Sequence, residues 1–156
     1  MTTPPTPQLL EALMDEALAE ARAAQAAGEV PVGAVVWHQG QVIGRGRNTA
    51  EGDAHVVSHA ELHAIRAASK HLGDWRLNEA ILAVTLEPCT MCLGAIRLAR
   101  IPTVVFGAGD SQQGAVGSLY DLSLDERLGP PPRVIRSIRK DACEELLKSF
   151  FKGLRT

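Results

Sequence analysis

The fold and the chemistry of this chain depend on two short stretches, His59-Ala60-Glu61 and Pro88-Cys89-Thr90-Met91-Cys92. Each stretch is expected to open a helix, because Ser58 can cap the apolar run that follows it and proline suits the first position of a helix. Both stretches would then lie at helix N-termini. Unpaired N–H groups and the helix dipole favour negative charge there, and so favour a thiolate over a thiol.

Three soft ligands are available at these two helix ends. Cys89 and Cys92 are three positions apart and share one face of a helix, and His59 supplies an imidazole. Two thiolates and one imidazole suit zinc, and a shell of three protein ligands leaves a fourth position for water, as in catalytic zinc sites. Zinc can lower the pKa of such a water to about 7, so hydroxide is available at neutral pH. The sequence therefore predicts a catalytic zinc site.

Glu61 lies two positions beyond His59 and is predicted to move protons rather than to bind the metal, because carboxylate oxygen is a hard ligand. Two structural interpretations stay open. Ser58 and Glu61 also match a capping box, in which Glu61 would only bond the backbone at the helix start. His63, one helical turn after His59, would complete a closed Cys₂His₂ zinc site with no position for water.

Length and composition restrict the class of protein. The 156 residues suffice for one domain with a full core, which we expect over residues 9–156, after a proline-containing disordered tail over residues 1–8. A content of 46% hydrophobic and 22% charged residues is typical of a soluble globular protein, and no apolar run is long enough to span a membrane. Three cysteines, two of them in C-x-x-C, favour metal chemistry in the reducing cytoplasm over a disulfide framework.

The net charge of −2 gives no sign of a nucleic-acid partner, but its distribution is uneven. Residues 133–156 hold seven lysines or arginines and only three acidic residues. A basic segment of this kind can contact phosphate groups, although most such clusters are solvated surface. Charge alone therefore leaves both interpretations open.

Hydrophobic periodicity predicts the order of the elements. The expected helices are 9–27, 59–70, 88–100 and 141–152, and the expected strands are 32–37, 41–44, 80–85, 103–106 and 133–138. A strand, a helix and a strand in so few residues require a right-handed parallel crossover, so the fold is an α/β sheet. Ligand sites in such sheets lie where a strand gives way to a helix, which is where the second stretch begins.

These residues resemble the bacterial tRNA adenosine deaminases, a family of the cytidine deaminase-like superfamily. The pattern H-x-E followed by P-C-x-x-C is the signature of zinc-dependent nucleobase deaminases and identifies the superfamily only. The likeness runs from about residue 29 to residue 151, and its family-specific parts are the glycine-rich stretch 114–119 and the closing Phe150-Phe151. It implies a three-layer α/β/α fold with a central mixed five-stranded sheet.

The resemblance also implies hydrolytic conversion of adenosine to inosine at the wobble position of a tRNA anticodon. A single-stranded loop suits this reaction, because its base can swing out into a pocket at low cost. The resemblance further implies a homodimer with one zinc ion per subunit. The site residues that it implies are His59, Cys89 and Cys92 for zinc, Glu61 for proton transfer, and Asn48 and Asp110 for the substrate.

Two other functions are compatible with the sequence. A deaminase of a free nucleobase such as guanine would use the same ligands and glutamate but would not need a basic C-terminal segment. A non-catalytic, zinc-stabilised RNA-binding module would need the zinc ligands but not the glutamate.

Overall fold

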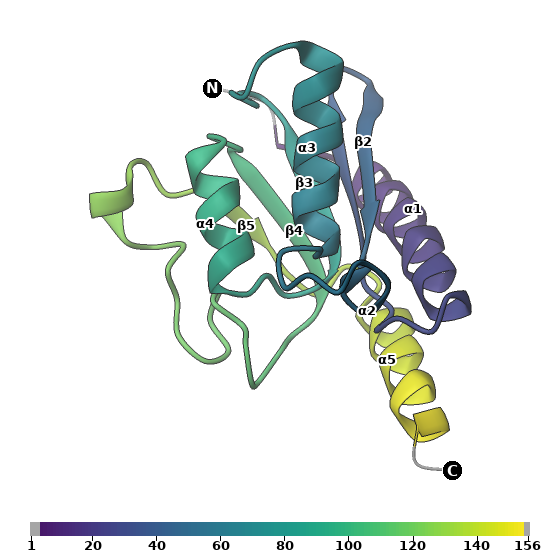
Figure 1. Ribbon diagram of the computed structural model, residues 1–156. Coiled ribbons are helices and arrows are strands. Elements are labelled where there is room, and N and C mark those ends of the chain that lie inside the picture. The colour runs from purple at the N-terminus through teal and green to yellow at the C-terminus, as the bar shows by residue number, and fades with distance from the viewer. Residues whose placement is uncertain (1–3, 155–156) are drawn as a thin grey trace.

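The computed structural model describes residues 4–154 of the chain. The strands in this range are β1 (Gly33–His38), β2 (Gln41–Arg47), β3 (Ile81–Leu86), β4 (Thr103–Ala108) and β5 (Arg133–Ile135). They form one sheet in the order β2-β1-β3-β4-β5 (Figure 1). β1 pairs antiparallel with β2 and β3, whereas β3, β4 and β5 run parallel, so the mixed five-stranded sheet is confirmed.

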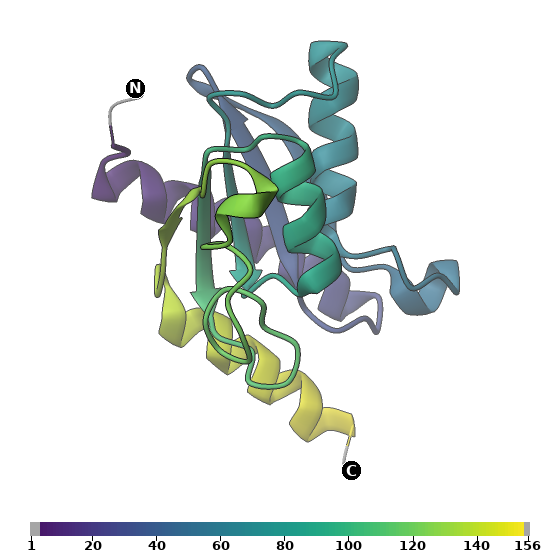
Figure 2. The ribbon, with the colours of Figure 1, turned by 90° about the vertical axis from the view of Figure 1, so that its left-hand side faces the viewer.

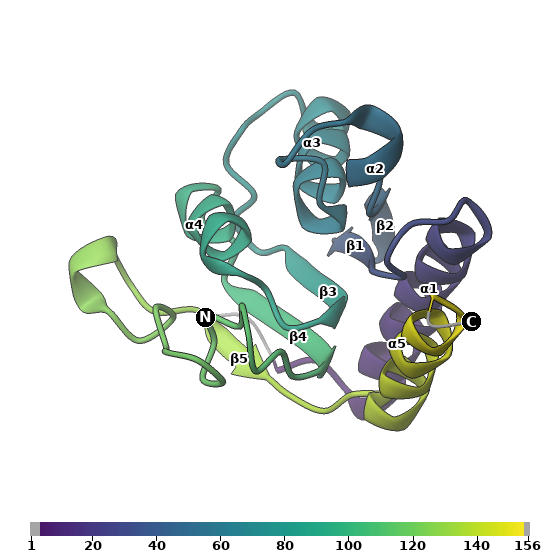
Figure 3. The same cartoon turned by 60° about the horizontal axis from the view of Figure 1, so that its bottom comes forward.

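Helices cover both faces of this sheet. They are α1 (Pro7–Ala26), α2 (Ala50–Asp53), α3 (Ala60–Leu72), α4 (Thr90–Leu98) and α5 (Lys140–Leu154), with a 3₁₀ turn at Glu126–Leu128. α1 and α5 pack on one face, and α3 and α4 pack on the other, as the view along the strands shows (Figure 3). The three-layer α/β/α architecture expected from the resemblance is confirmed.

The central strands contribute side chains to two separate cores. In β1, Val35 packs on the α1 side while Val36 packs on the α3 side, and in β3 Ala83 and Leu82 divide in the same way. All four side chains are buried. A strand that is buried on both faces has a continuous apolar sequence. The apolar runs in the sequence therefore predicted β3 and β4 well.

The first helix begins earlier than the sequence suggests. We expected a disordered tail over residues 1–8, but α1 begins at Pro7, so the last two residues of that range are helical. Thr6 Oγ1 accepts the N–H of Leu9 at 3.1 Å, and proline in the first turn needs no partner for an N–H group. Residues 1–3 of the expected tail lie outside the described part of the chain.

The approach to the first motif also differs from expectation. Residues 48–57 contain the short helix α2, and α3 has His59 rather than Ser58 at its N-cap position. Ser58 Oγ donates instead to Asp53 Oδ2 at 2.7 Å. The nearby carboxylate is the stronger acceptor for this hydroxyl, and its bond holds Ser58 in the turn that precedes the helix.

The C-terminal elements follow the prediction with one correction. β5 ends at Ile135 rather than at residue 138, because Ser137 and Arg139 adopt φ values of 65° and 55°, which are incompatible with a strand. Cys143 of α5 is buried. Within residues 4–154, no helix combines the length and the hydrophobicity needed to cross a membrane.

Candidate active site

Three ligand atoms converge where β3 gives way to α4. His59 and Cys89 occupy the N-cap positions of α3 and α4, and Cys92 follows in the first turn of α4. His59 Nδ1 lies 3.7 Å from Cys89 Sγ and 3.4 Å from Cys92 Sγ. All three atoms lie within 4.8 Å of one another, and no second group of metal-ligating side chains converges in this way among the described residues.

These separations fit a zinc ion. With ligand bonds of about 2.1 Å to nitrogen and 2.3 Å to sulfur, a tetrahedral shell places nitrogen and sulfur about 3.6 Å apart. The two observed N–S separations lie on either side of that value. The chain therefore presents an imidazole and two thiols at a distance from one another that could hold a metal ion.

The three ligands also perturb one another. The hydrogen bond from Cys92 is the main reason why the pKa of Cys89 falls to about 4, with His59 adding to the effect. The same bond, together with burial, raises the pKa of the Cys92 thiol. The hydrogen bond to Cys89 raises the pKa of His59. One thiolate is thus stabilised beside the imidazole by the fold itself.

Glu61 is a buried carboxyl group in the first turn of α3, with 4% of its surface exposed. Burial is the main reason why the pKa of Glu61 rises to about 7, and the neighbouring Cys89 thiolate adds to the rise. The capping box is contradicted, because the Ser58 N–H bonds the carbonyl of His55 and α3 has no side-chain cap. Glu61 is therefore not held as a capping residue.

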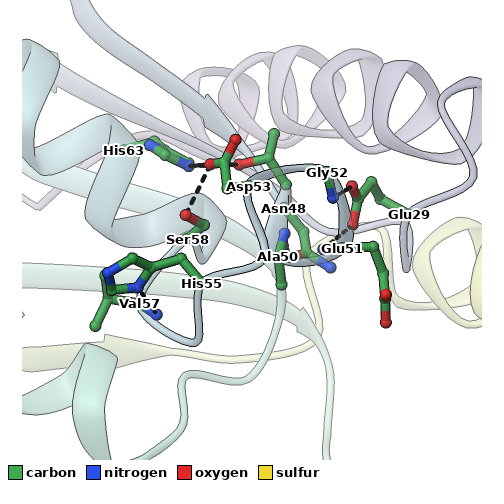
Figure 4. Close-up of polar contacts among 11 residues, drawn as sticks. Glu29, Asn48, Ala50, Glu51, Gly52, Asp53, His55, Val57, Ser58 and His63 are labelled. Atoms are coloured by element: carbon green, nitrogen blue, oxygen red, sulfur yellow. Dashed lines mark hydrogen bonds and ion pairs between the residues drawn. The ribbon is translucent and has the colours of Figure 1, made fainter.

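The closed Cys₂His₂ alternative is also wrong. His63 Nε2 is hydrogen-bonded to Thr49 Oγ1 at 2.8 Å and lies 3.9 Å from Asp53 Oδ2. It is not among the converging ligand atoms. In Figure 4 His63 lies beside Asp53. The described ligand set therefore stays at three.

The ligands open into a pocket of about 200 Å³. Five of the six predicted site residues line this pocket, and the sixth, Cys92, is fully buried. The pocket is lined by Val30, Val32, Asn48, His59, Ala60, Glu61, Leu86, Glu87, Cys89 and Asp110. The structure thus brings together the predicted metal ligands, the predicted acid and both predicted substrate residues.

Residues 48–58, here called the first wall segment, connect Asn48 in the pocket to His59, a predicted metal ligand. The amide of Asn48 is oriented by backbone groups, since its Nδ2 donates to the Val30 carbonyl at 3.2 Å and its Oδ1 accepts the Ala50 N–H at 3.1 Å. An amide has two donors and two acceptor sites. Asn48 therefore keeps one amide donor and one acceptor site beyond these two bonds.

Two carboxylates hold the first wall segment in place (Figure 4). Glu29, with only 4% exposed surface, accepts the N–H groups of Glu51 at 2.9 Å and Gly52 at 2.7 Å, one with each oxygen. Asp53 lies closer to the solvent and accepts the hydroxyls of Thr49 and Ser58, both at 2.7 Å, with Oδ2. The segment is therefore fixed on both sides of α2.

A third carboxylate, Glu87, organises the opposite side of the pocket. Residues 109–118, here called the second wall segment, donate the N–H groups of Asp110 (3.1 Å), Val116 (2.9 Å) and Ser118 (3.1 Å) to its two oxygens. The Ser118 hydroxyl donates as well. Burial alone would raise the pKa of Glu87, but these four hydrogen bonds outweigh it and lower the pKa.

Sequence reasoning missed the roles of Glu29 and Glu87. Both lie in stretches that support the family resemblance, but neither was given a function of its own. The available signal was an acidic residue beside a buried apolar run, Glu29 before Val30 and Glu87 after Leu86. Such residues are almost never buried without partners, so each indicates a set of donors elsewhere in the chain.

A wide groove adjoins the pocket and shares Val30, Leu86 and Asp110 with it. Its far side is formed by Lys148, Phe151, Lys152 and Leu147 of α5. Figure 2 shows the loop after β4, in green, beside α5, in yellow. Part of the basic C-terminal segment therefore faces the same opening as the pocket.

The chain is similar to known deaminases over most of its length. The MafB19-like deaminase family model matches residues 10–155. The tRNA-specific adenosine deaminase of Streptococcus pyogenes serotype M1 is 44% identical over 139 residues, which make up 89% of this chain and 81% of that protein.

Two solved structures have a similar fold. A structure from a study of A-to-I editing by tRNA:A34 deaminases has a TM-score of 0.81 and 40% identity, and the match covers 87% of this chain and 99% of that one. The guanine deaminase of Bacillus subtilis has a TM-score of 0.61 and 32% identity, with 77% of this chain and 89% of that one covered. The chain therefore belongs to the family of the tRNA-specific adenosine deaminases.

Proposed function

We propose that this protein is a zinc-dependent hydrolase that converts adenosine to inosine at the wobble position of a tRNA anticodon. The observation that carries this proposal is one constellation: His59, Cys89 and Cys92 converge beside the buried Glu61, at a pocket that Asn48 and Asp110 also line. Neither a redox site nor a structural zinc site needs a buried acid and a pocket at the ligands.

Zinc bound by the three ligands would supply Lewis-acid activation of water for attack on C6 of the adenine ring. The other steps fall to the chain. Glu61 accepts one proton of the attacking water and passes it to the ring nitrogen N1. It then accepts the second proton from the oxygen that is now bound to C6 and delivers it to the amine as the C6–N bond breaks. Adenosine and water thus become inosine and ammonia, and the carboxyl group ends in its initial state.

The pocket walls orient the base. Asn48 offers one amide donor and one acceptor site, which suits the polar edge of a purine. Because the base must leave its stack to enter, a single-stranded anticodon loop is a better substrate than a duplex. The groove beside the pocket supports an RNA partner, since Lys148 and Lys152 can contact phosphates and the half-exposed Phe151 can stack on a base.

The test is a comparison of substrates. The protein is incubated with an anticodon stem-loop that carries adenosine at the wobble position, and separately with guanine and adenine as free bases. Inosine should form in the stem-loop. Turnover of a free base together with an unchanged stem-loop would show that the guanine deaminase alternative is correct.

A single substitution separates an enzyme from a non-catalytic RNA-binding module. Glu61→Gln should retain one zinc per subunit, measured by elemental analysis, and should retain stem-loop binding, while activity falls by several orders of magnitude. A wild-type protein that binds the stem-loop without altering it would support the module instead. A loss of zinc in Glu61→Gln would show that Glu61 is a ligand and not the proton shuttle.

We also propose that the protein is a homodimer, as the family resemblance implies. A groove on the α4 side of the molecule is lined by Trp75, Leu98, Leu128 and three consecutive prolines at 130–132. Leu98 is 77% exposed, which is unfavourable for a large apolar side chain unless another surface covers it. Light scattering should give twice the mass of the chain, and Leu98→Glu should give the monomer mass.

A further inference from the structure

Glu87 lies at the junction between the metal ligands and the substrate side of the pocket. Its own N–H donates to the Ala108 carbonyl at 2.8 Å, which continues the pairing of β3 with β4. Two residues later the chain supplies Cys89. The backbone position of Glu87 is therefore fixed both by the sheet and by the first metal ligand that follows it.

The side chain of Glu87 points away from this fixed backbone to the second wall segment. Its Oε1 accepts the Asp110 N–H near the beginning of the segment, and its Oε2 accepts the N–H groups of Val116 and Ser118 near the end. One carboxylate thus closes a loop of nine residues from both ends. A further bond, from the Ala115 N–H to the Pro88 carbonyl at 2.9 Å, lies beside it.

Every hydrogen bond to the Glu87 side chain comes from a donor, which suits an ionised carboxylate because it can only accept. Three backbone N–H groups and one hydroxyl donate to its oxygens, and the residue has 2% of its surface exposed, so water cannot replace these donors. Although Glu87 lines the pocket, its oxygens are engaged by the second wall segment. Its chemistry is that of an anchor for backbone groups and not that of an acid or a base.

We propose that Glu87 is a positioning residue that sets the distance between the substrate-facing wall at Asp110 and the zinc ligands. This inference rests on the proposed function, because it assigns Asp110 to the substrate side of the deaminase pocket. Asp110 Oδ1 accepts the N–H groups of Gln112 and Gln113, so its side chain is rigid within the segment. When Glu87 holds Asp110, it therefore holds a preformed turn.

The test variant is Glu87→Gln, which keeps the size of the side chain but replaces one acceptor oxygen with an NH₂ group that faces backbone donors. We expect the KM for the stem-loop to rise at least tenfold while kcat changes by less than about threefold, because binding is lost and the acid and zinc ligands are unchanged. Zinc content should stay at one per subunit. A purely structural defect would instead lower the active fraction, so that kcat and zinc content fall together and KM stays constant.

Hydrogen exchange tests the same inference without substrate. In Glu87→Gln the amides of residues 110–118 should exchange at least tenfold faster, whereas those of α3 should be unchanged. Glu16→Gln is the matched control, because it makes the same replacement at a partly exposed carboxylate that pairs with Arg45 outside both wall segments. Its KM and exchange rates should stay within about threefold of wild type.

The outcomes are separable. If wild-type protein does not deaminate the stem-loop, the proposed function fails, but the exchange result still decides whether Glu87 holds the segment. If the wild type is active while Glu87→Gln has unchanged KM and unchanged exchange, the positioning role is wrong. A simultaneous loss of zinc and kcat at constant KM would overturn it as well.

Discussion

The two walls of the pocket are held by the same chemistry but to different degrees. The second wall segment depends on Glu87, which is buried and accepts donors from both ends of the loop. The first wall segment depends on the buried Glu29 and on Asp53, whose side chain is 49% exposed. Water can replace the hydroxyl donors of Asp53 but not the donors of Glu87, so the first wall tolerates more change.

The exposed apolar residues of the first wall agree with this difference. Val56 and Val57 are 75% and 43% exposed at the outer turn of the segment, where no carboxylate holds the backbone directly. The second wall has Gly114, Ala115 and Val116 buried toward its end, while most of its other residues are exposed. The second wall is therefore anchored in the core at residues 114–116, whereas the first is a surface loop with anchored ends, and substitutions at these anchor points should affect the two unequally.

The largest effect is expected for Gly114→Ala in the second wall. An added Cβ would lie 2.5 Å from the Asp110 carbonyl oxygen and 2.5 Å from the carboxyl carbon of Glu87, and neither neighbour can move without breaking the loop. Overpacking of this kind costs about 2–3 kcal/mol of the free energy of unfolding. Denaturant unfolding measures this loss, and stem-loop turnover should fall with it.

Gly94→Ala is the matched control for that variant. Gly94 lies in α4, two residues after Cys92, and an added Cβ meets no other atom within 4 Å. Alanine is favoured over glycine in a helix by about 0.5–1 kcal/mol, so this variant should be as stable as wild type or more stable. An equal loss of stability in both variants would contradict the claim that close packing around Gly114 makes the second wall sensitive to an added methyl group.

The sequence alone predicts some features of the fold and the site better than others. The three converging side chains His59, Cys89 and Cys92 lie in two short stretches, so the sequence alone could predict that they form one group. The buried strands β3 and β4 were found because they are apolar on both faces. These features depend on local pattern and on residue type, and both are visible without a structure.

The anchors of the walls were not predictable in the same way. Glu29 and Gly52 are 23 positions apart, and Glu87 and Ser118 are 31 positions apart. The donors to these carboxylates are mostly backbone N–H groups, which every residue except proline has.

Ser58 shows a second limit of prediction from sequence. Its residue type favours a helix cap, but a carboxylate five positions earlier forms the stronger bond, so the pattern predicted the wrong cap.

A smaller effect is expected for Glu29→Gln in the first wall. The variant replaces a carboxylate that accepts two backbone N–H groups, and hydrogen bonds to a buried charged group contribute about 1.5–3 kcal/mol, so we expect a loss within that range. Thermal or denaturant unfolding gives the value. Hydrogen exchange should accelerate at residues 50–53 and not at residues 110–118.

Glu16→Gln provides the comparison for Glu29. Glu16 pairs with Arg45 at 2.7 Å, but both side chains are largely exposed, and such pairs contribute about 0–1 kcal/mol. A change of the same size in Glu16→Gln and Glu29→Gln would contradict the claim that burial is what makes the wall anchors strong.

The smallest effect is expected for Asp53, and it should depend on pH. Hydrogen bonds from Thr49 and then Ser58 lower the pKa of Asp53 below its ordinary value of 3.8. A carboxyl group with a lowered pKa in the folded state stabilises the fold above its unfolded pKa, and this stabilisation disappears as the pH falls through the folded pKa. The difference in Tm between wild type and Asp53→Asn should therefore be constant near neutral pH and should vanish well below pH 3.8.

Metal-free protein is used for both variants, so that release of zinc in acid does not contribute. A difference in Tm that grows on acidification would show that the first wall is not held by the ionised form of Asp53.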